Sequence, residues 1–188
     1  MINSVLSFVE KSLNEYIRMR FDLNEDKIII GNLTTQEGTL AIKDQNKIVL
    51  SLVNIQEERM MKGSGKVFSK GSMGDSGFSN PPIHLNLYLL FTSFFEQQLF
   101  NEGLKFLSLV IGFFQAQNVF NSVDFAEFSF DIEKLVFELE NLSFQEQNNL
   151  WGSLGCKYIP SVLYKVRMIS ITENVIQEIG EVIREQNQ

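Results

Sequence analysis

Two apolar segments separated by a glycine- and lysine-rich loop constrain the fold of this chain more than any other feature. The second segment, Pro81–Phe95, alternates apolar and polar side chains over most of its length, which is the period of a strand with one buried face. The first, Lys47–Met61, is apolar on both faces at its start and becomes polar towards its end. We therefore predict a long β-hairpin, with the segment Lys62–Asn80 as an oversized loop at its tip.

The periodicity of the remaining chain predicts an α+β fold. Apolar residues at three- and four-residue spacing predict helices at Met1–Arg20 and Leu104–Phe114, and a capping box at Ser143–Glu146 opens another. Further strands are expected at Lys27–Gly31, Thr39–Lys43, Ile132–Asn141 and Ser161–Ile171, with an irregular connection at Gln115–Ser129 and a short acidic helix in Glu173–Gln188. Segregated strands and helices favour a mostly antiparallel sheet with helices packed on it.

The length and composition favour one domain with a hydrophobic core. The chain has 188 residues, of which 44% are hydrophobic. We expect a single domain at residues 1–172, with a flexible loop at 62–80 and an acidic C-terminal tail at 173–188. The start of the chain has no basic region before an apolar core and is not expected to be a signal peptide. The longest apolar runs fall short of the ~20 residues that span a bilayer.

The charge and cysteine content exclude several classes of protein. The net charge of −7 argues against binding to nucleic acid or to an anionic membrane, both of which attract basic surfaces. Cys156 is the only cysteine, so the chain has no internal disulfide, which fits a reducing compartment. Cys156 itself is expected to act as a small buried hydrophobic residue.

The segment Gly63–Lys66 resembles part of a phosphate-binding loop but lacks its essential features. That loop has the pattern GxxxxGK[ST] and joins a strand to a helix, whose backbone amides face the phosphate. Here Val67 follows Lys66, the glycine spacing differs, and the loop is expected to join two strands. We therefore do not interpret this segment as a nucleotide site.

The same loop is basic, although the chain as a whole is acidic. Lys62, Lys66 and Lys70 stand against a single acidic residue, Asp75. Long loops are often either functional or disordered, and both interpretations stay open: an arm that orders against an acidic neighbour, or a solvated loop. The candidate interface residues are these three lysines and the polar end of the preceding strand, Glu57, Glu58 and Arg59.

The sequence offers no catalytic motif. His84 is the only histidine, and no HExxH, cysteine cluster or GxSxG pattern is present. We therefore predict no catalytic residue, no cofactor and no metal site, and interpret His84 as a surface or pairing residue. The alternatives are a monomeric module that binds a ligand or partner, and a small enzyme that uses the Gly63–Lys66 loop and His84.

The seventeen phenylalanines have two interpretations. Most are expected in the core, and a few at an association surface, because exposed aromatic patches mark such surfaces. The candidates for the surface are Phe113, Phe114, Phe120, Phe125, Phe128 and Phe130.

Several phrases of the sequence, taken in order, resemble the cap proteins of extracellular contractile injection systems. They are MINSVLSFVEKSLNEY, IVLSLVNIQEER, NPPIHLNLYLLFTSFF, LKFLSLVIGFFQ and LWGSLGCKYIPSVLYKVRMISI. The resemblance extends over about Met1–Ile171, and the tail from Glu173 matches least. Such particles resemble phage tails, as in the Photorhabdus virulence cassette and the antifeeding prophage.

The resemblance implies a non-enzymatic structural protein similar to a phage tail terminator. It implies a homohexameric ring on the baseplate-distal end of the tube and sheath, where the ring ends polymerisation and sets the particle length. The implied partners are other copies of the chain and the tube and sheath proteins. The implied location is the cytoplasm during assembly and afterwards the injection particle itself.

Overall fold

The computed structural model describes residues 2–35, 37–39, 41–42, 45–58, 67–70, 76–79, 84–122, 132–170 and 178–179. The described helices are α1 (Ile2–Phe21), the short 3-10 helix η2 (Gln97–Leu99), α2 (Phe100–Ala116) and α3 (Phe144–Leu154). The strands are β1 (Ile28–Ile30), β2 (Lys47–Glu57), β3 (Val67–Lys70), β4 (Ser76–Ser79), β5 (Leu85–Phe94), β6 (Val119–Asn121), β7 (Ile132–Glu140), β8 (Ser161–Ser170) and β9 (Glu178–Ile179).

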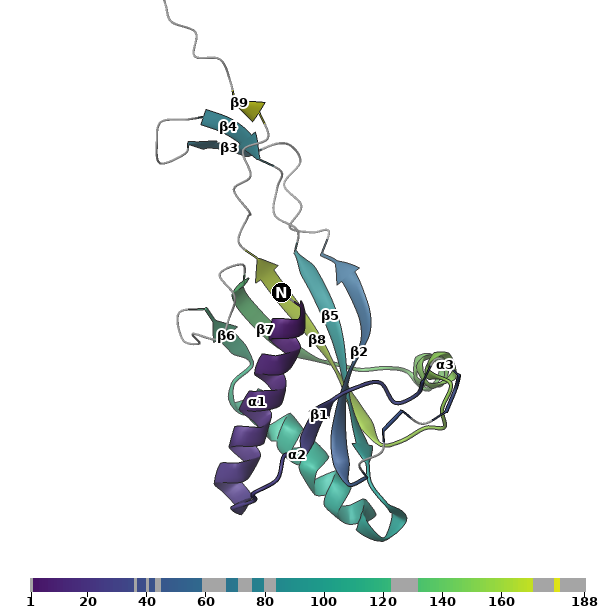
Figure 1. Cartoon of the computed structure of the whole chain (residues 1–188). Helices are drawn as coiled ribbons and strands as arrows, with labels where there is room; N and C mark the ends of the chain where they lie inside the picture. Colours follow the sequence, from purple (N-terminus) through teal and green to yellow (C-terminus); the bar gives the residue numbers. More distant parts are fainter. Residues whose placement is uncertain are drawn as a thin grey trace, which may run out of the picture.

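A six-stranded sheet forms the body of the molecule, in the order β1-β2-β5-β8-β7-β6 (Figure 1). β1 runs parallel to β2, and every other neighbouring pair in this sheet is antiparallel. The predicted hairpin is confirmed: β2 pairs with β5 from Lys47 opposite Phe94 to Glu57 opposite Leu85, with a bulge between Leu52 and Asn54. The α+β class with a mostly antiparallel sheet is therefore correct.

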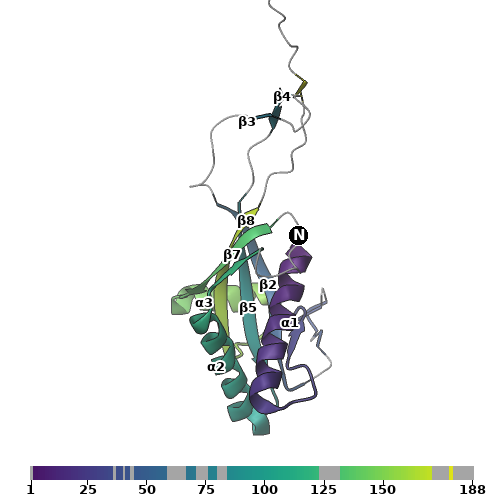
Figure 2. The ribbon, with the colours of Figure 1, turned by 90° about the vertical axis from the view of Figure 1, so that its left-hand side faces the viewer.

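Two helices, α1 and α2, cover one face of the sheet and enclose the main core (Figure 2). The inward side chains of α1 recur at helical spacing, as the sequence predicted, and include Val5, Val9 and Leu13. Aromatic rings fill the space between α2 and the sheet, where Phe114 stacks on Phe137 with ring centroids 4.4 Å apart. Burial of this face is the main stabilising term of the fold.

Helix α2 approaches β5 closely at Gly103. A Cβ atom at this position would lie 2.3 Å from Ser93 Oγ and 2.8 Å from the ring of Phe95. Only glycine fits there without displacing its neighbours. This contact explains why small, polar Ser93 interrupts the apolar face of β5.

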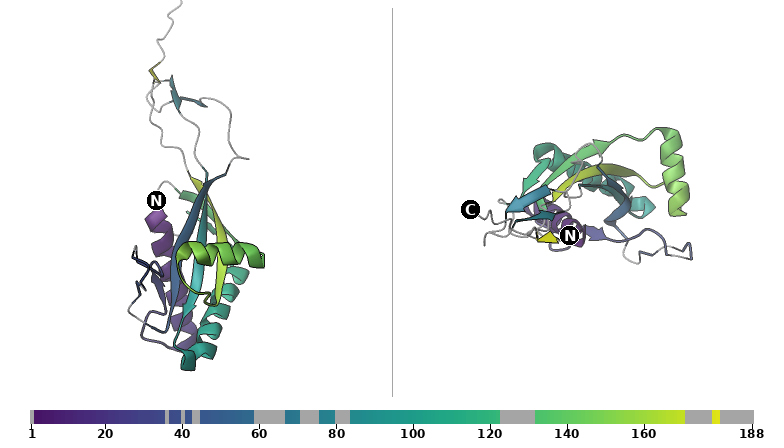
Figure 3. Two further views of the ribbon diagram at one scale, coloured as in Figure 1. Left: turned by 90° about the vertical axis from the view of Figure 1, so that its right-hand side faces the viewer. Right: turned by 90° about the horizontal axis from the view of Figure 1, so that it is seen from above.

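Helix α3 covers part of the opposite face (Figure 3). It begins with the predicted capping box, in which Ser143 Oγ accepts a hydrogen bond from the amide of Glu146 and the Glu146 carboxylate accepts one from the amide of Ser143. It ends at Gly155, whose φ of 69° is left-handed. The buried indole of Trp151 packs in the cluster that contains Val49, Leu90 and Leu163.

Some expected elements differ in the structure. Thr39, Ala41 and Ile42 are not in a strand, and β6 lies within the connection expected to be irregular. Within 62–80, β3 pairs antiparallel with β4, and β4 pairs with β9. Glu178 and Ile179 are therefore extended and not helical, because the tail pairs with the loop, a contact that local sequence periodicity does not encode.

None of the helices in the described part of the chain is both long and apolar enough to cross a membrane.

Candidate functional site

The face of the sheet opposite α1 and α2 has an apolar half, which α3 covers, and a polar half, which α3 does not cover. The polar sheet face comprises Asn54, Gln56, Glu58, Asn86, Tyr88, Glu138, Lys165 and Arg167, which the strand registers place side by side. Antiparallel sheets commonly leave one face in contact with solvent or a partner. This face is therefore the first candidate for an interaction surface.

Polar contacts order the side chains of this face. Asn86 Nδ2 donates to Glu58 Oε2 at 3.0 Å, and Lys165 Nζ lies 4.0 Å from the same carboxylate oxygen. Tyr88 donates from its hydroxyl to Gln56 Oε1 at 3.0 Å. Arg167 forms an ion pair with Glu138 across β7 and β8. Opposite charges in neighbouring strands stabilise the sheet modestly and fix its register.

The structure separates the interface residues that the sequence suggested. Glu58 joins the polar sheet face, whereas Glu57 precedes it in the chain and so belongs to the other face of β2. Lys70 is the last residue of β3. Arg59, Lys62 and Lys66 lie outside the described residues, as does the Gly63–Lys66 segment, so the structure tests neither their contacts nor the phosphate-loop comparison.

His84 lies at the entry to β5, and its backbone carbonyl accepts a hydrogen bond from the amide of Glu58 at 2.8 Å. Its contact with β2 is thus one of strand pairing. The described residues contain no group of three or more His, Cys, Asp or Glu side chains arranged to hold a metal ion. Cys156 is partly buried, and its burial raises the pKa of the thiol above the usual range, which favours the protonated, unreactive form.

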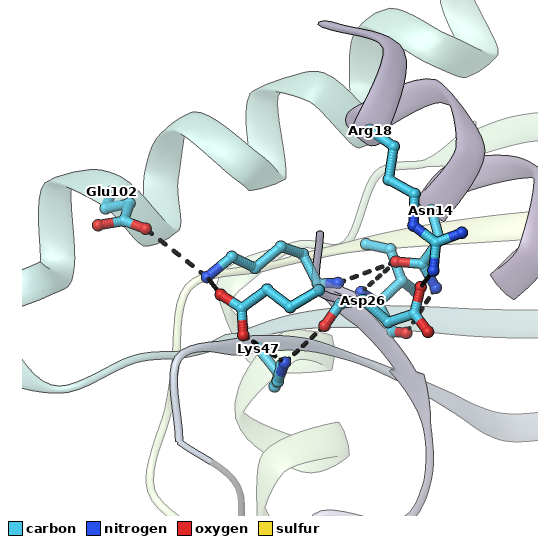
Figure 4. Close-up of polar contacts among 8 residues, drawn as sticks. Asn14, Arg18, Asp26, Lys47 and Glu102 are labelled. Carbon is cyan, nitrogen blue, oxygen red and sulfur yellow. Dashed lines mark hydrogen bonds and ion pairs between the residues drawn. The ribbon is translucent and has the colours of Figure 1, made fainter. Parts of the chain in front are cut away.

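An ionic cluster ties the turn before β1 to α2 and β2 (Figure 4). Its members are Glu25, Lys27, Lys47 and Glu102. The Lys27 side chain is only 8% exposed; it forms an ion pair with Glu25, and its Nζ lies 3.9 Å from Glu102. Hydrogen bonds from Lys27 and then Lys47 lower the pKa of Glu25. The buried ammonium of Lys27 and the partly buried one of Lys47 are thus matched by carboxylates, so we interpret this cluster as structural.

The corner between β7 and α3 exposes apolar side chains that sequence reasoning missed. Phe144 is 92% exposed and Leu139 is 48% exposed. Phe144 precedes Trp151 by seven residues, so both belong to one face of α3, yet Trp151 is only 4% exposed. Helical periodicity therefore predicts an inward Phe144. The feature of the sequence that could have indicated an exposed Phe144 is its position in the first turn of α3, directly after the cap residue Ser143.

Three of the aromatic residues considered for an association surface, Phe113, Phe114 and Phe120, lie in the core instead. Phe114 and Phe120 are buried, and Phe113 packs against the same cluster. They are covered because β6 and α1 close over them, with Phe120 in ring contact with Phe8. Phe125, Phe128 and Phe130 lie outside the described residues.

A hollow of about 200 Å³ opens beside this corner. Its lining includes Leu90, Leu139, Glu140, Leu142, Leu150 and Trp151. The pKa of Glu146, in the first turn of α3, is lowered by hydrogen bonds from the side chain and then the backbone of Ser143, so the carboxylate carries its charge at neutral pH. The corner therefore combines a partly apolar hollow with negative charge.

Comparisons with known proteins agree on one fold. The chain is similar to the anti-feeding prophage cap, described as the AFP tube terminating cap, with a TM-score of 0.59 and 17% identity over 96% of this chain and 60% of that one. It is also similar to the PVC sheath/tube terminator of an extracellular contractile injection system in the extended state, with a TM-score of 0.55 and 18% identity over 94% of this chain and 62% of that one. Both were determined by cryo-EM.

This chain thus spans about three fifths of the length of each of these solved structures. A search of curated proteins finds no match. The family model described as the Pvc16 N-terminal domain matches residues 4–185, which is nearly the whole chain. The chain therefore belongs to the Pvc16 N-terminal domain family.

Proposed function

We propose that this protein is a structural cap, or tail terminator, of a contractile injection system. It forms a ring on the baseplate-distal end of the tube and sheath and ends their polymerisation. The observation that carries this proposal is the fold shared along 96% of the chain with a tube terminating cap. The family match over residues 4–185 supports it independently of the coordinates.

The architecture suits a ring subunit. A ring requires two different surfaces on each copy, so that a head-to-tail contact repeats until it closes. The described chain has an ordered polar sheet face, an ionic cluster at the other end of β2, and an exposed apolar corner at β7 and α3. These surfaces differ in chemistry, which is what a repeating head-to-tail contact needs. A homohexamer is the stoichiometry we propose.

The partners we propose are further copies of this chain and the tube and sheath proteins of the same particle. The candidate contact residues stay Lys62, Lys66, Lys70, Glu57, Glu58 and Arg59. The role is non-enzymatic and needs no cofactor; the support is that both similar structures are named for capping or terminating. Assembly in the cytoplasm precedes incorporation into the particle.

The location of the protein on the particle tests this proposal. Particles carrying an epitope-tagged copy are labelled with gold-conjugated antibody and imaged. We expect label on one end only, opposite the baseplate. Label along the whole sheath, on the baseplate, or absent from purified particles contradicts the proposal. Particles that carry the same tag on a sheath subunit are the matched control, because their label must extend along the whole particle.

A further inference from the structure

The two edges of the six-stranded sheet are closed to different degrees. At the β1 edge, Asn14 Oδ1 accepts hydrogen bonds from the amides of Lys27 and Ile28, each at 2.9 Å, and Asn14 Nδ2 donates to the carbonyl of Ile28 at 2.9 Å. Glu10 Oε1 accepts from the amide of Ile30 at 3.0 Å. Side chains of α1 thus occupy backbone groups that an added strand would need.

The opposite edge is open near the end of β7. β6 pairs with β7 only at Lys134, Leu135 and Val136, and the amide of Phe137 donates to the carbonyl of Asn118 at 2.8 Å. Backbone groups of a strand alternate in direction, so those of Leu139 point to the same side as those of Phe137. In the described part of the chain no strand pairs with β7 there. An unpaired edge of this kind is a template for another strand.

The side chains at this open edge suit an incoming segment. The exposed Leu139 lines the hollow of about 200 Å³, and the exposed Phe144 lies in the first turn of α3, the helix that supplies Leu150 and Trp151 to its lining. A cavity of roughly 150 Å³ accommodates a benzene ring, so this hollow has room for one large side chain. Leu139 and Trp151 line its apolar part, and Glu140 and Gln147 line its polar part. The site can therefore take an extended backbone along Leu139 and one side chain beneath it.

Charge identifies the segment that fits. The β7–α3 corner has two carboxylates, on Glu140 and Glu146, whereas Glu138 on the same strand is already paired with Arg167. The segment 62–80 has the opposite balance, with three lysines and one aspartate in a chain of net charge −7. Complementary charges favour encounter of these two surfaces and disfavour contact between like surfaces.

We propose that the β7–α3 corner binds the lysine-rich segment 62–80 of a second copy of this chain, with one stretch of that segment extended alongside Leu139. This inference rests on the proposed ring and names its subunit contact. The corner and the segment are different parts of the chain, so the contact is head-to-tail and repeats from copy to copy. Phe144 packs against the incoming segment, and Glu140 meets its lysines.

Self-association of the full chain tests the contact, measured by analytical ultracentrifugation over a range of concentrations. We expect Glu140→Lys and Phe144→Ser each to raise the dissociation constant about tenfold or more. The Phe144 side chain is exposed and the Glu140 side chain is partly exposed. The circular dichroism spectrum and the melting temperature of each variant should therefore stay close to those of the wild type. Glu15→Lys, the same charge change on the outer face of α1, is the control and should leave association unchanged. A wild-type chain that is monomeric at every concentration overturns the proposal.

Mixing two defective chains distinguishes contact between copies from contact within one copy. One chain carries Glu140→Lys, and the other carries Lys62→Glu, Lys66→Glu and Lys70→Glu. Each alone should associate weakly, whereas an equimolar mixture should assemble, because each arm then meets a corner of opposite charge. No recovery in the mixture overturns the proposal. If Glu140→Lys chains associate normally and still terminate particles, this contact is wrong although the cap function stands.

Discussion

Asn14 and Ile28 form a two-way hydrogen-bonded pair between helix α1 and the edge strand β1. The side-chain oxygen of Asn14 accepts from the amide of Ile28, and its amide nitrogen donates to the carbonyl of Ile28, both at 2.9 Å. Asn14 is buried, so water does not readily replace it. The side chain therefore acts as a short substitute for a neighbouring strand.

Replacing Asn14 by alanine should destabilise the fold. The change leaves backbone groups of Lys27 and Ile28 buried without partners, which costs about 2–3 kcal/mol of the free energy of unfolding. Urea denaturation of the purified chain measures it. Asn148→Ala, at an exposed position in α3, is the control and should change the stability by less than about 0.5 kcal/mol. Equal effects of the two substitutions would show that the Asn14 pair contributes nothing specific.

Gly103→Ala should be destabilising by about 1–3 kcal/mol, because the added methyl group overlaps Ser93 and Phe95. Gly112→Ala in the same helix has no atom within 4 Å of the new Cβ and should be neutral or stabilising by up to about 1 kcal/mol. Thermal melts of the two variants provide the comparison. A Gly103→Ala chain as stable as Gly112→Ala would contradict the close approach of α2 to β5.

The ionic cluster should give the stability a small acid dependence. Because Lys27 and Lys47 lower the pKa of Glu25 in the folded chain, its contribution is present above the unfolded value near 4.5 and is lost as the pH falls through the folded pKa. Glu25 is more than half exposed, so solvent screening keeps this contribution below about 1 kcal/mol. Wild type should exceed Glu25→Gln in stability at pH 6 and converge with it below the folded pKa. If the difference in stability between the two chains grew as the pH fell, the predicted direction of the effect would be wrong.

Glu57→Lys tests the proposed contact at the end of β2. Glu57 is exposed, so the substitution should change the free energy of unfolding by less than about 0.5 kcal/mol. If this strand end contacts another subunit, incorporation of the variant into particles should nevertheless fall several-fold, measured by quantitative immunoblotting of purified particles against Glu15→Lys. Incorporation at the wild-type level would remove Glu57 from the interface.

The sequence was sufficient for elements whose pattern is local. The alternation in Pro81–Phe95 predicted β5 and its pairing with β2, and Ser143 with Glu146 predicted the start of α3. It was insufficient where a distant contact decides the structure. β9 exists because the tail pairs with β4. Asn14 is a buried polar residue in α1 whose partners are backbone groups of Lys27 and Ile28, which local sequence does not identify.

The candidate site also combines residues that a local sequence pattern predicts with residues that only distant contacts bring together. The polar end of its strand predicted Glu58 as an interface residue, and this stays a prediction. The structure adds Asn86 and Lys165, which the strand register brings beside Glu58. Phe144 was missed because periodicity describes the face of a helix and not how much of that face the sheet covers. Exposure of one turn depends on where α3 crosses the strands, which is a tertiary property.

Particle length tests the central claim most directly. Particles are purified from cells with and without this protein, and their tubes and sheaths are measured by electron microscopy, with restoration of the wild-type chain as the control. We expect particles without the protein to have longer and more variable tubes or to lose their sheaths, and restoration to recover a single length. A narrow, unchanged length distribution with intact sheaths in its absence would contradict the account.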